Sequence, residues 1–417
     1  MPTTPGLPVR RAALRLLDAV LRRGETLEIA EGAALSGIRT APDRALARAI
    51  ASETLRWLTD IDALIDSVTK QRLPDDAKAR MVLRIMLAQA LRLDTPAHAV
   101  IATGLPLLAG GPRRLAHGVF STLVKPGAGT LPEHPTLPES VVARWGAEKA
   151  AAIAPGLAFP PELDLALKDA AETETRAVAM GGVTLAPGHV RLPRGAAVDT
   201  LADFKAGDWW VQDLAASIPA RLLGDGTGKN ALDLCAAPGG KTMQLAAAGW
   251  NVTALDMSKR RLELLKDNLK RTGLKASPVR ADALVWEPKH RFDAILIDAP
   301  CTATGTCRRH PDVLHRIGAR QIPEMVELQR GLAAKAAEWL NPGGVLVYAV
   351  CSLEVEEGEQ QAAWIDANCG LAPMPITAAE LPAGLAPTAE GWLRTHPGML
   401  ADRGGLDGFF VARWLKS

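Results

Sequence analysis

Residues 296–301, Leu-Ile-Asp-Ala-Pro-Cys, and residues 347–352, Val-Tyr-Ala-Val-Cys-Ser, decide the fold, because each is an apolar run that stops at a cysteine. Unbroken runs of Ile, Leu, Val and Ala are typical of strands buried on both faces of a parallel sheet. Ligands of such sheets bind beyond the carboxyl ends of the strands. If the two strands are neighbours, the sulfurs of Cys301 and Cys351 face one crevice.

Strands of this kind alternate with helical segments from residue 230 onward, which predicts a doubly wound α/β sheet. The predicted strands are 231–235, 252–256, 278–281, 292–298 and 344–350. The predicted helices are 241–248, 258–272, 323–340 and 356–368. Residues 407–415 read as a last strand at the edge of the sheet.

The first part of the chain has helical periodicity instead. Leu14, Leu17 and Leu21 recur on one helical face. Further helices are predicted over 42–70, 75–93, 95–109 and 112–124. We therefore expect an all-helical domain over 1–125.

A stretch rich in Gly and Pro follows and predicts a linker over 126–138. Beyond it, helices are predicted over 139–149 and 164–178, and short strands near 183–192 and 208–212. These mixed elements predict a small α+β subdomain over 139–225, before the α/β domain over 226–417.

Composition and charge limit the classes of protein to consider. The 417 residues contain 48% hydrophobic and 23% charged residues, as in globular proteins, and no apolar run long enough to span a membrane. None of the five cysteines has zinc-ligand spacing, so no metal site is expected. Reduced thiols favour a cytoplasmic protein, and no sequence pattern requires a partner chain, so we expect a monomer.

Charge is unevenly distributed along the chain. Residues 1–125 carry 18 Lys+Arg against 12 Asp+Glu, and the remainder carries 30 against 34. A basic first domain is compatible with binding to RNA. Solvated helix faces rich in arginine are an equally simple explanation.

Residues 232–242, Leu-Asp-Leu-Cys-Ala-Ala-Pro-Gly-Gly-Lys-Thr, read as a strand, a tight turn and the start of a helix. Small residues and glycines allow a ligand to approach the backbone, and the helix start offers free N–H groups. The stretch matches neither the phosphate-loop nor the dinucleotide fingerprint. The candidate cofactor-binding residues are Cys235, Ala236, Ala237, Pro238, Gly239, Gly240 and Lys241. An ordinary strand-to-helix turn is the alternative for the glycines.

Acidic residues follow the next two predicted strands. Asp256 is placed to accept ribose hydroxyls, and Asp282 is placed to reach an adenine amino group. Each could instead cap a helix. Adenosine binding without a phosphate cradle indicates S-adenosylmethionine as the cofactor.

Five strings carry a family resemblance. They are DLCAAPGGKT at 233–242, DAPCTATG at 298–305, RRHPD at 308–312, PEMVELQ at 323–329 and VCSLEVEEGE at 350–359. The chain resembles the RNA cytosine-5 methyltransferases, and among them the bacterial small-subunit ribosomal RNA methyltransferase B group. Residues 9–125 resemble the NusB-type RNA-binding domain of that group. The resemblance implies a class I, Rossmann-like S-adenosylmethionine-dependent methyltransferase domain after an all-α domain and a small α+β subdomain.

Between 126 and 204 the resemblance is weaker. Family members usually show Arg-x-Asn after a short strand there, whereas this chain has Leu165-Ala166-Leu167-Lys168-Asp169. The departure puts the matching RNA contact in doubt. Gln212-Asp213 does fit the family pattern.

The resemblance also implies a mechanism by residue. Cys351 is the nucleophile that adds to cytosine C6, and Cys301 helps to remove the C5 proton and to release the enzyme. Asp298 contacts N3 or N4 of the base and also the cofactor. A free thiol has a pKa of ~8.5, so a basic neighbour would favour the thiolate. Lys241, Arg308 and Arg309 are the candidates, although the two arginines could lie in a solvated loop.

Other functions remain open at this point. Methyltransferases of exocyclic amines need Asn/Asp-Pro-Pro-aromatic, where this chain has Asp298-Ala299-Pro300-Cys301. A silent RNA-binding scaffold is disfavoured by the presence of both cysteines. We expect ribosomal RNA as the substrate, with an unpaired or flipped cytosine; transfer RNA is the alternative.

Overall fold

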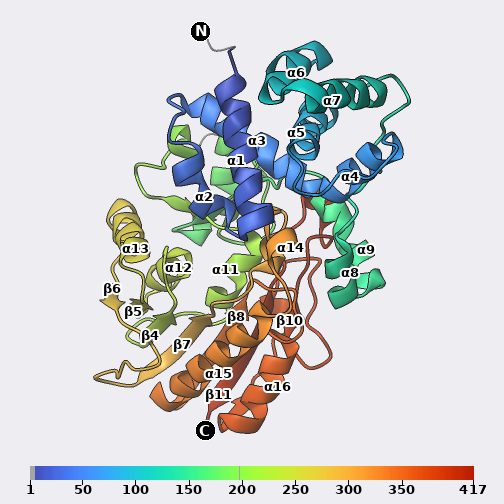
Figure 1. Cartoon of the computed structure of the whole chain (residues 1–417). Helices are drawn as coiled ribbons and strands as arrows, with labels where there is room; N and C mark the ends of the chain where they lie inside the picture. Colours follow the sequence, from blue (N-terminus) through green and yellow to red (C-terminus); the bar gives the residue numbers. More distant parts are fainter. Residues whose placement is uncertain (1–4, 197) are drawn as a thin grey trace. The chain divides into compact units, whose positions relative to one another are not determined.

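In the computed structural model, which describes residues 5–196 and 198–417, the chain forms two compact units (Figure 1). The first, the helical unit, comprises residues up to Phe159 together with Cys307–Ile317. The second, the sheet unit, comprises Pro160–Thr306 and Gly318–Ser417. The four-part division expected above is finer than these units and stays a prediction. No helix among the described residues has the length and apolar character needed to cross a membrane.

The helical unit is built around α1 (Leu7–Arg23) and α5 (Lys78–Arg92), whose side chains contribute much of its core. Leu17 of α1 is fully buried, and Leu14 and Leu21 pack partly buried against the same core. Its helices are α1 (Leu7–Arg23), α2 (Leu27–Ala34), α3 (Ala41–Arg56), α4 (Leu58–Ser67), α5 (Lys78–Arg92), α6 (Ala97–Gly104), α7 (Gly110–Leu123), α8 (Glu139–Trp145), α9 (Ala147–Ile153) and α14 (Val313–Arg316). The helix expected over 42–70 is therefore two helices, which meet at Trp57, whose φ of −108° departs from helical geometry.

Two arginines in the core of the helical unit are neutralised by aspartates. Arg80 and Arg84, both on α5, are buried. Arg80 Nη1 lies 2.6 Å from Asp66 Oδ1, and Arg84 Nη2 lies 2.7 Å from Asp62 Oδ2. Because an isolated buried charge is costly, these pairs are what allows α5 to be buried along most of its length.

A short segment from the C-terminal half of the chain folds with the helical unit. The guanidinium of Arg56 donates to the carbonyl of Arg308 at 2.9 Å. His315 Nε2 donates to the carbonyl of Leu55 at 2.7 Å. Arg308 is 2% exposed, so the solvated-loop interpretation is wrong for it, whereas Arg309 is exposed.

The sheet unit contains an eight-stranded sheet in the order β10-β11-β8-β7-β4-β5-β6, with β9 paired to β11. Its strands are β4 (Asn230–Leu234), β5 (Asn251–Asp256), β6 (Ser277–Arg280), β7 (Phe292–Asp298), β8 (Leu340–Val350), β9 (Leu371–Pro373), β10 (Leu393–Arg394) and β11 (Phe410–Lys416). The strands β4 to β8 are parallel, and β11 is antiparallel to β8. The predicted α/β class is confirmed. The edge position predicted for the last strand is wrong, because β11 lies between β8 and the short strands β9 and β10.

Helices cover both faces of this sheet, which explains why its central strands are apolar throughout. On one face lie α15 (Gln321–Trp339) and α16 (Glu359–Asn368) (Figure 1). They pack on alternate residues such as Ile295 and Ile297. On the other, α11 (Leu214–Arg221) and α12 (Gly240–Ala247) pack on the residues between, such as Leu296. The helix α13 (Lys259–Thr272) packs beside α12.

A second, three-stranded antiparallel sheet has the order β2-β1-β3. Its strands are β1 (Leu163–Leu167), β2 (His189–Leu192) and β3 (Trp209–Val211). The helix expected over 164–178 is wrong, because residues 163–167 form β1 and the helix α10 begins only at Thr173 (Thr173–Met180). Leu163, Leu165 and Leu167 have the two-residue spacing of a strand. Because β1 pairs with β2 on one side and β3 on the other, this segment forms a strand and not a helix.

A buried ion pair inside the small sheet also contacts the rest of the unit. Arg191 donates to both oxygens of Asp164, at 2.6 and 2.7 Å, and also to the carbonyl of Arg403. Asp164 also accepts the backbone N–H of Leu214 at the start of α11. Burial raises the pKa of Asp164, but the hydrogen bonds from Arg191 and the His189 ring, 3.3 Å away, outweigh it and leave the pKa below its ordinary value.

We expect Asp164→Ala to lower the free energy of unfolding by about 3–5 kcal/mol, because it leaves the buried Arg191 guanidinium without its partner. Urea unfolding followed by circular dichroism measures the change. The matched control is Asp267→Ala, on the exposed face of α13, which should cost less than about 0.5 kcal/mol. Equal effects of the two substitutions would contradict the role given to the pair.

A second prediction concerns pH. Burial lowers the pKa of His315, so its neutral ring is favoured in the folded chain. The unfolded chain then binds the proton more readily, and stability must fall as pH drops below about 6.5, by about 1.4 kcal/mol for each pKa unit of difference. His315→Gln keeps an N–H donor for Leu55 and should reduce the loss of melting temperature between pH 7.5 and 5.5. The exposed His98→Gln should leave that loss unchanged; a wild-type loss in His315→Gln would refute the assignment.

Candidate active site

The two cysteines singled out in the sequence lie side by side in the sheet unit. Their strands β7 and β8 are parallel neighbours, with Asp298 opposite Ala349. Beyond the strands, the Ala299 N–H donates to the Ala349 carbonyl at 2.9 Å. The sulfurs of Cys301 and Cys351 are 3.5 Å apart, close enough for one thiol to hydrogen-bond to the other.

A fully buried carboxylate joins the two loops that carry these cysteines. Glu357 accepts the backbone N–H of Thr302 at 2.9 Å and the side-chain amide of Gln329 at 3.1 Å. It also accepts the hydroxyls of Thr302 and Ser352. The same amide of Gln329 donates to the carbonyl of Pro300 at 2.9 Å, so one set of contacts ties both loops to α15.

The sequence reasoning did not single out Glu357. The residue lies in the string VCSLEVEEGE, but glutamates are common in exposed segments just before a helix. Its neighbour Glu356 is exposed, and only the structure separates the two. A signal was present, however, since Glu357 lies six residues after the cysteine in a string chosen for its likeness to a family.

The turn after β4 has the geometry of a ligand cradle. Cys235 has φ 61° and Gly239 has φ 108°, and α12 begins at Gly240, with its free N–H groups at the same edge of the sheet. Ala236 and Ala237 are buried. The Ala236 N–H donates to the carbonyl of Leu255 on β5 at 3.1 Å, which holds the turn against the neighbouring strand.

The three candidate aspartates end consecutive strands at this edge. Asp256 is buried and accepts the N–H groups of Ser258 at 2.8 Å and Ala237 at 3.2 Å. Asp282, after β6, is exposed and accepts the N–H of Leu284. Both therefore stabilise turns, and their remaining lone pairs can still accept ligand hydroxyls or amino groups.

The third aspartate, Asp298, ends β7 three residues before Cys301. Its side chain is 34% exposed and forms an ion pair with Lys241, whose Nζ lies 2.7 Å from Oδ2. Lys241 is buried and lies 5.3 Å from the ring centre of Phe409. Three basic residues were proposed to favour a thiolate. Of these, Lys241 is paired with Asp298, and Arg308 and Arg309 belong to the helical unit.

A fourth acidic group lies beneath the turn. Asp233 is fully buried and accepts the hydroxyl of Thr242 at 2.5 Å, while its Oδ1 has no hydrogen-bond partner. Burial raises its pKa to about 7, with the nearby Asp298 adding to the effect. Burial likewise raises the pKa of the Cys235 thiol to about 12 and that of Cys369 to about 11, so neither is suited to act as a thiolate near neutrality.

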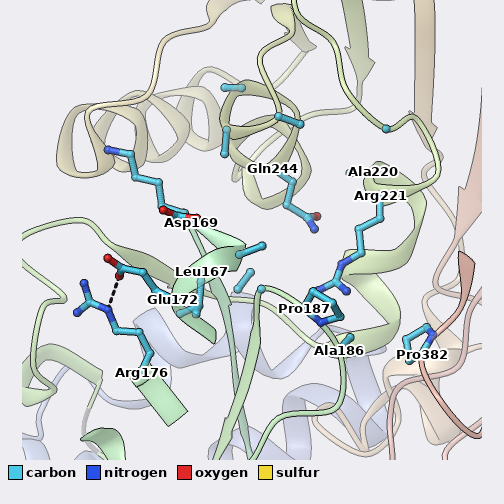
Figure 2. Close-up of a pocket in the computed structure, with 18 of the residues that line it drawn as sticks. Leu167, Asp169, Glu172, Arg176, Ala186, Pro187, Ala220, Arg221, Gln244 and Pro382 are labelled. Carbon is cyan, nitrogen blue, oxygen red and sulfur yellow. Dashed lines mark hydrogen bonds and ion pairs between the residues drawn. The ribbon is translucent and has the colours of Figure 1, made fainter. Parts of the chain in front are cut away.

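One large cavity of the sheet unit lies elsewhere. It measures about 930 Å³ and includes Ala246–Ala248, at the end of α12 opposite the cofactor-loop candidates. Figure 2 shows the Arg221 guanidinium beside Pro187 in this cavity, and Arg176 paired with Glu172. None of the predicted site residues lines it. Among the described residues, no group of three or more His, Cys, Asp or Glu side chains could hold a metal ion.

Comparisons with known protein families match both parts of the chain. Residues 220–415 match the family described as 16S rRNA methyltransferase RsmB/F, and residues 7–107 match the NusB family. The first match contains every residue considered above as catalytic or cofactor-binding.

Whole-chain relatives agree with these matches. Ribosomal RNA small subunit methyltransferase B of Xanthomonas campestris is 33% identical over 85% of this chain and 87% of its own. The protein of the same name from Xylella fastidiosa is 32% identical over 99% of this chain and 98% of its own.

Solved structures share the fold. A methyltransferase homologue from Pyrococcus horikoshii has a TM-score of 0.56 at 26% identity and covers 67% of this chain and 94% of its own. NSun6 from the same organism has a TM-score of 0.58 at 20% identity, over 67% and 98% of the two chains, which supports the fold alone.

Proposed function

Because the chain belongs to the RsmB/F family of 16S rRNA methyltransferases, we propose that it methylates carbon 5 of a cytosine in small-subunit ribosomal RNA through a covalent adduct of Cys351. Membership makes it an S-adenosylmethionine-dependent RNA methyltransferase that acts on ribosomal RNA. Two parts of the proposal go beyond family membership, namely the target atom and the covalent route. The observation that supports both is the 3.5 Å separation of the two sulfurs.

The residues at the sheet edge fit S-adenosylmethionine. Asp256 and Asp282 offer carboxylates to a nucleoside, and the turn at 235–240 offers close backbone approach without a phosphate cradle. When bound, the cofactor supplies an electrophilic methyl group. Asp298 carries negative charge at the same edge, which suits a sulfonium ligand.

Cysteine chemistry is needed because cytosine C5 is a poor nucleophile. The Cys351 thiolate adds to C6, and the electron pair displaced from the C5–C6 bond makes C5 nucleophilic. After C5 has gained its methyl group, the Cys301 sulfur accepts the C5 proton, the C5–C6 double bond re-forms and Cys351 leaves as a thiolate. Two sulfurs in contact can serve both carbons of one ring edge.

Asp298 would select the base. Its carboxylate is part exposed and held by Lys241, so it can accept a hydrogen bond from the cytosine amino group. Uracil has a carbonyl at that position and would leave the carboxylate facing an acceptor. We assign to Asp298 the preference for cytosine, and the cofactor contact remains a second role for it.

The base must leave its stack to reach this edge, so an unpaired or flipped cytosine is the expected target. The basic excess of residues 1–125 supports RNA binding by the NusB-like domain. Transfer RNA is less favoured, because the whole-chain relatives are ribosomal RNA enzymes. A silent scaffold would not need two cysteines in contact.

Substituting each cysteine in turn tests the two different roles proposed for them. With small-subunit RNA and S-adenosylmethionine, Cys301→Ala should accumulate a protein–RNA adduct on denaturing gels, because enzyme release is blocked. Cys351→Ala should form no adduct and lose methyl transfer by on the order of 10³-fold or more, because the nucleophile is gone. Cys369→Ala, which removes a thiol of another part of the sheet unit, should behave as wild type. An adduct that persists in Cys351→Ala would overturn the assignment.

A further inference from the structure

The two sulfurs at the ends of β7 and β8 are close enough to be bonded to each other. Cys301 Sγ lies 3.5 Å from Cys351 Sγ, whereas the sulfurs of a disulfide are about 2.05 Å apart. Rotation of the two side chains has to close the remaining gap of about 1.5 Å. The spacing of the backbones suits the bond, because neighbouring strands run about 4.8 Å apart and disulfides join Cα atoms roughly 4.4–6.8 Å apart.

Hydrogen bonds outside the pair hold the two cysteine loops together. The Gly305 N–H, on the loop after β7, donates to the carbonyl of Cys351, on the loop after β8, at 3.0 Å. The buried Glu357 carboxylate accepts one donor from each loop, the Thr302 N–H and the Ser352 hydroxyl. These contacts use no thiol, so they do not depend on whether the sulfurs are reduced or bonded to each other.

The pair is also accessible to a small oxidant. Both cysteines are half-buried and lie at the edge where ligands of a parallel sheet bind, whereas Cys307 is fully buried. A peroxide reacts with the thiolate of a cysteine and converts it to a sulfenic acid. A sulfenic acid on either sulfur would lie in contact with a second thiol, which can trap it before it is oxidised further.

The reaction balances with hydrogen peroxide as the oxidant. The Cys351 thiolate attacks one oxygen, the O–O bond breaks, and the hydroxide that leaves takes up the proton lost by the thiol and becomes water. The Cys301 sulfur then attacks the sulfenic sulfur, the S–O bond breaks, and the hydroxyl group leaves with the Cys301 proton as a second water. Two thiols lose two electrons and two protons, and the peroxide is reduced.

We propose that Cys301 and Cys351 form a redox-sensitive switch, in which peroxide joins them in a disulfide that turns methyl transfer off and a thiol reductant turns it on again. The disulfide removes the nucleophile and the proton acceptor together. This loss of activity rests on the proposed function, whereas the disulfide rests on the geometry of the pair alone. Cys301 also protects Cys351, because thiols reduce a disulfide and do not reduce a sulfinic acid.

Peptide mapping of the full-length protein, without RNA or cofactor, tests for the bond. The reduced protein is treated with hydrogen peroxide, alkylated under denaturing conditions and digested without reductant. We expect two of the five thiols to be lost and one cross-linked peptide pair to contain Cys301 and Cys351. Dithiothreitol should restore all five thiols. Sulfinic acid on Cys351, or a disulfide to any other cysteine in place of this pair, would overturn the proposal.

Two variants sharpen the mapping. Cys301→Ser keeps the size of the side chain but removes the trapping thiol, so peroxide should carry Cys351 on to a sulfinic acid that dithiothreitol does not reverse. Cys369→Ala is the matched control, since it removes a thiol outside the pair and should form the same disulfide as wild type. A Cys351 that stays reducible in Cys301→Ser would contradict the protective role of Cys301.

Methyl transfer to small-subunit RNA is the second readout. Oxidised wild type should lose activity by about tenfold or more, because neither sulfur is free, and dithiothreitol should restore it. Cys369→Ala should show the same loss and recovery. If the disulfide forms while methyl transfer continues, both the switch and the proposed roles of the cysteines are wrong. If activity is lost without the disulfide, the switch alone is refuted.

Discussion

Parallel pairing of β7 with β8 is the constraint on which the site depends. It sets the ends of the two strands level, with Asp298 opposite Ala349, and so brings two loops 50 residues apart in sequence into contact. Both strands are buried on both faces, and a one-residue register shift would exchange the side chains that pack against the two helical layers. The energy that holds the sulfurs together is thus supplied by the core of the sheet and by the contacts of Glu357, and only in small part by the sulfurs themselves.

Carboxylates outnumber cations at this edge of the sheet. Asp233, Asp256 and Asp298 lie at the ends of neighbouring strands, where Lys241 pairs with Asp298 and Arg261 lies 3.5 Å from Asp256. A positively charged methyl donor is favoured in such a place, whereas a phosphate would be repelled. Burial, with the nearby aspartates adding to it, raises the pKa of Cys235 and keeps this thiol protonated, which leaves the chemistry to the pair at the ends of β7 and β8.

The sequence predicted those parts of the fold that depend on interactions between residues close together in the chain. The apolar runs ending at Asp298 and at Cys351 marked β7 and β8 within a few residues, and the turn after β4 was recognised from its glycines. Residues 163–167 were misread, because two-residue and helical spacing are hard to separate in so short a run and the pairing with β2 and β3 is not visible locally. Long-range facts were missed for the same reason: the burial of Glu357, the insertion of β11 beside β8, and the folding of residues 307–317 with the helical unit.

The central claim is that the methyl group goes to carbon 5 of a cytosine in ribosomal RNA. The most direct measurement is nucleoside analysis of small-subunit RNA after incubation with the enzyme and S-adenosylmethionine carrying a labelled methyl group. The account predicts that the label co-elutes with 5-methylcytidine after complete digestion. Label in a methylated amine such as N4-methylcytidine, or in any uridine derivative, would contradict it.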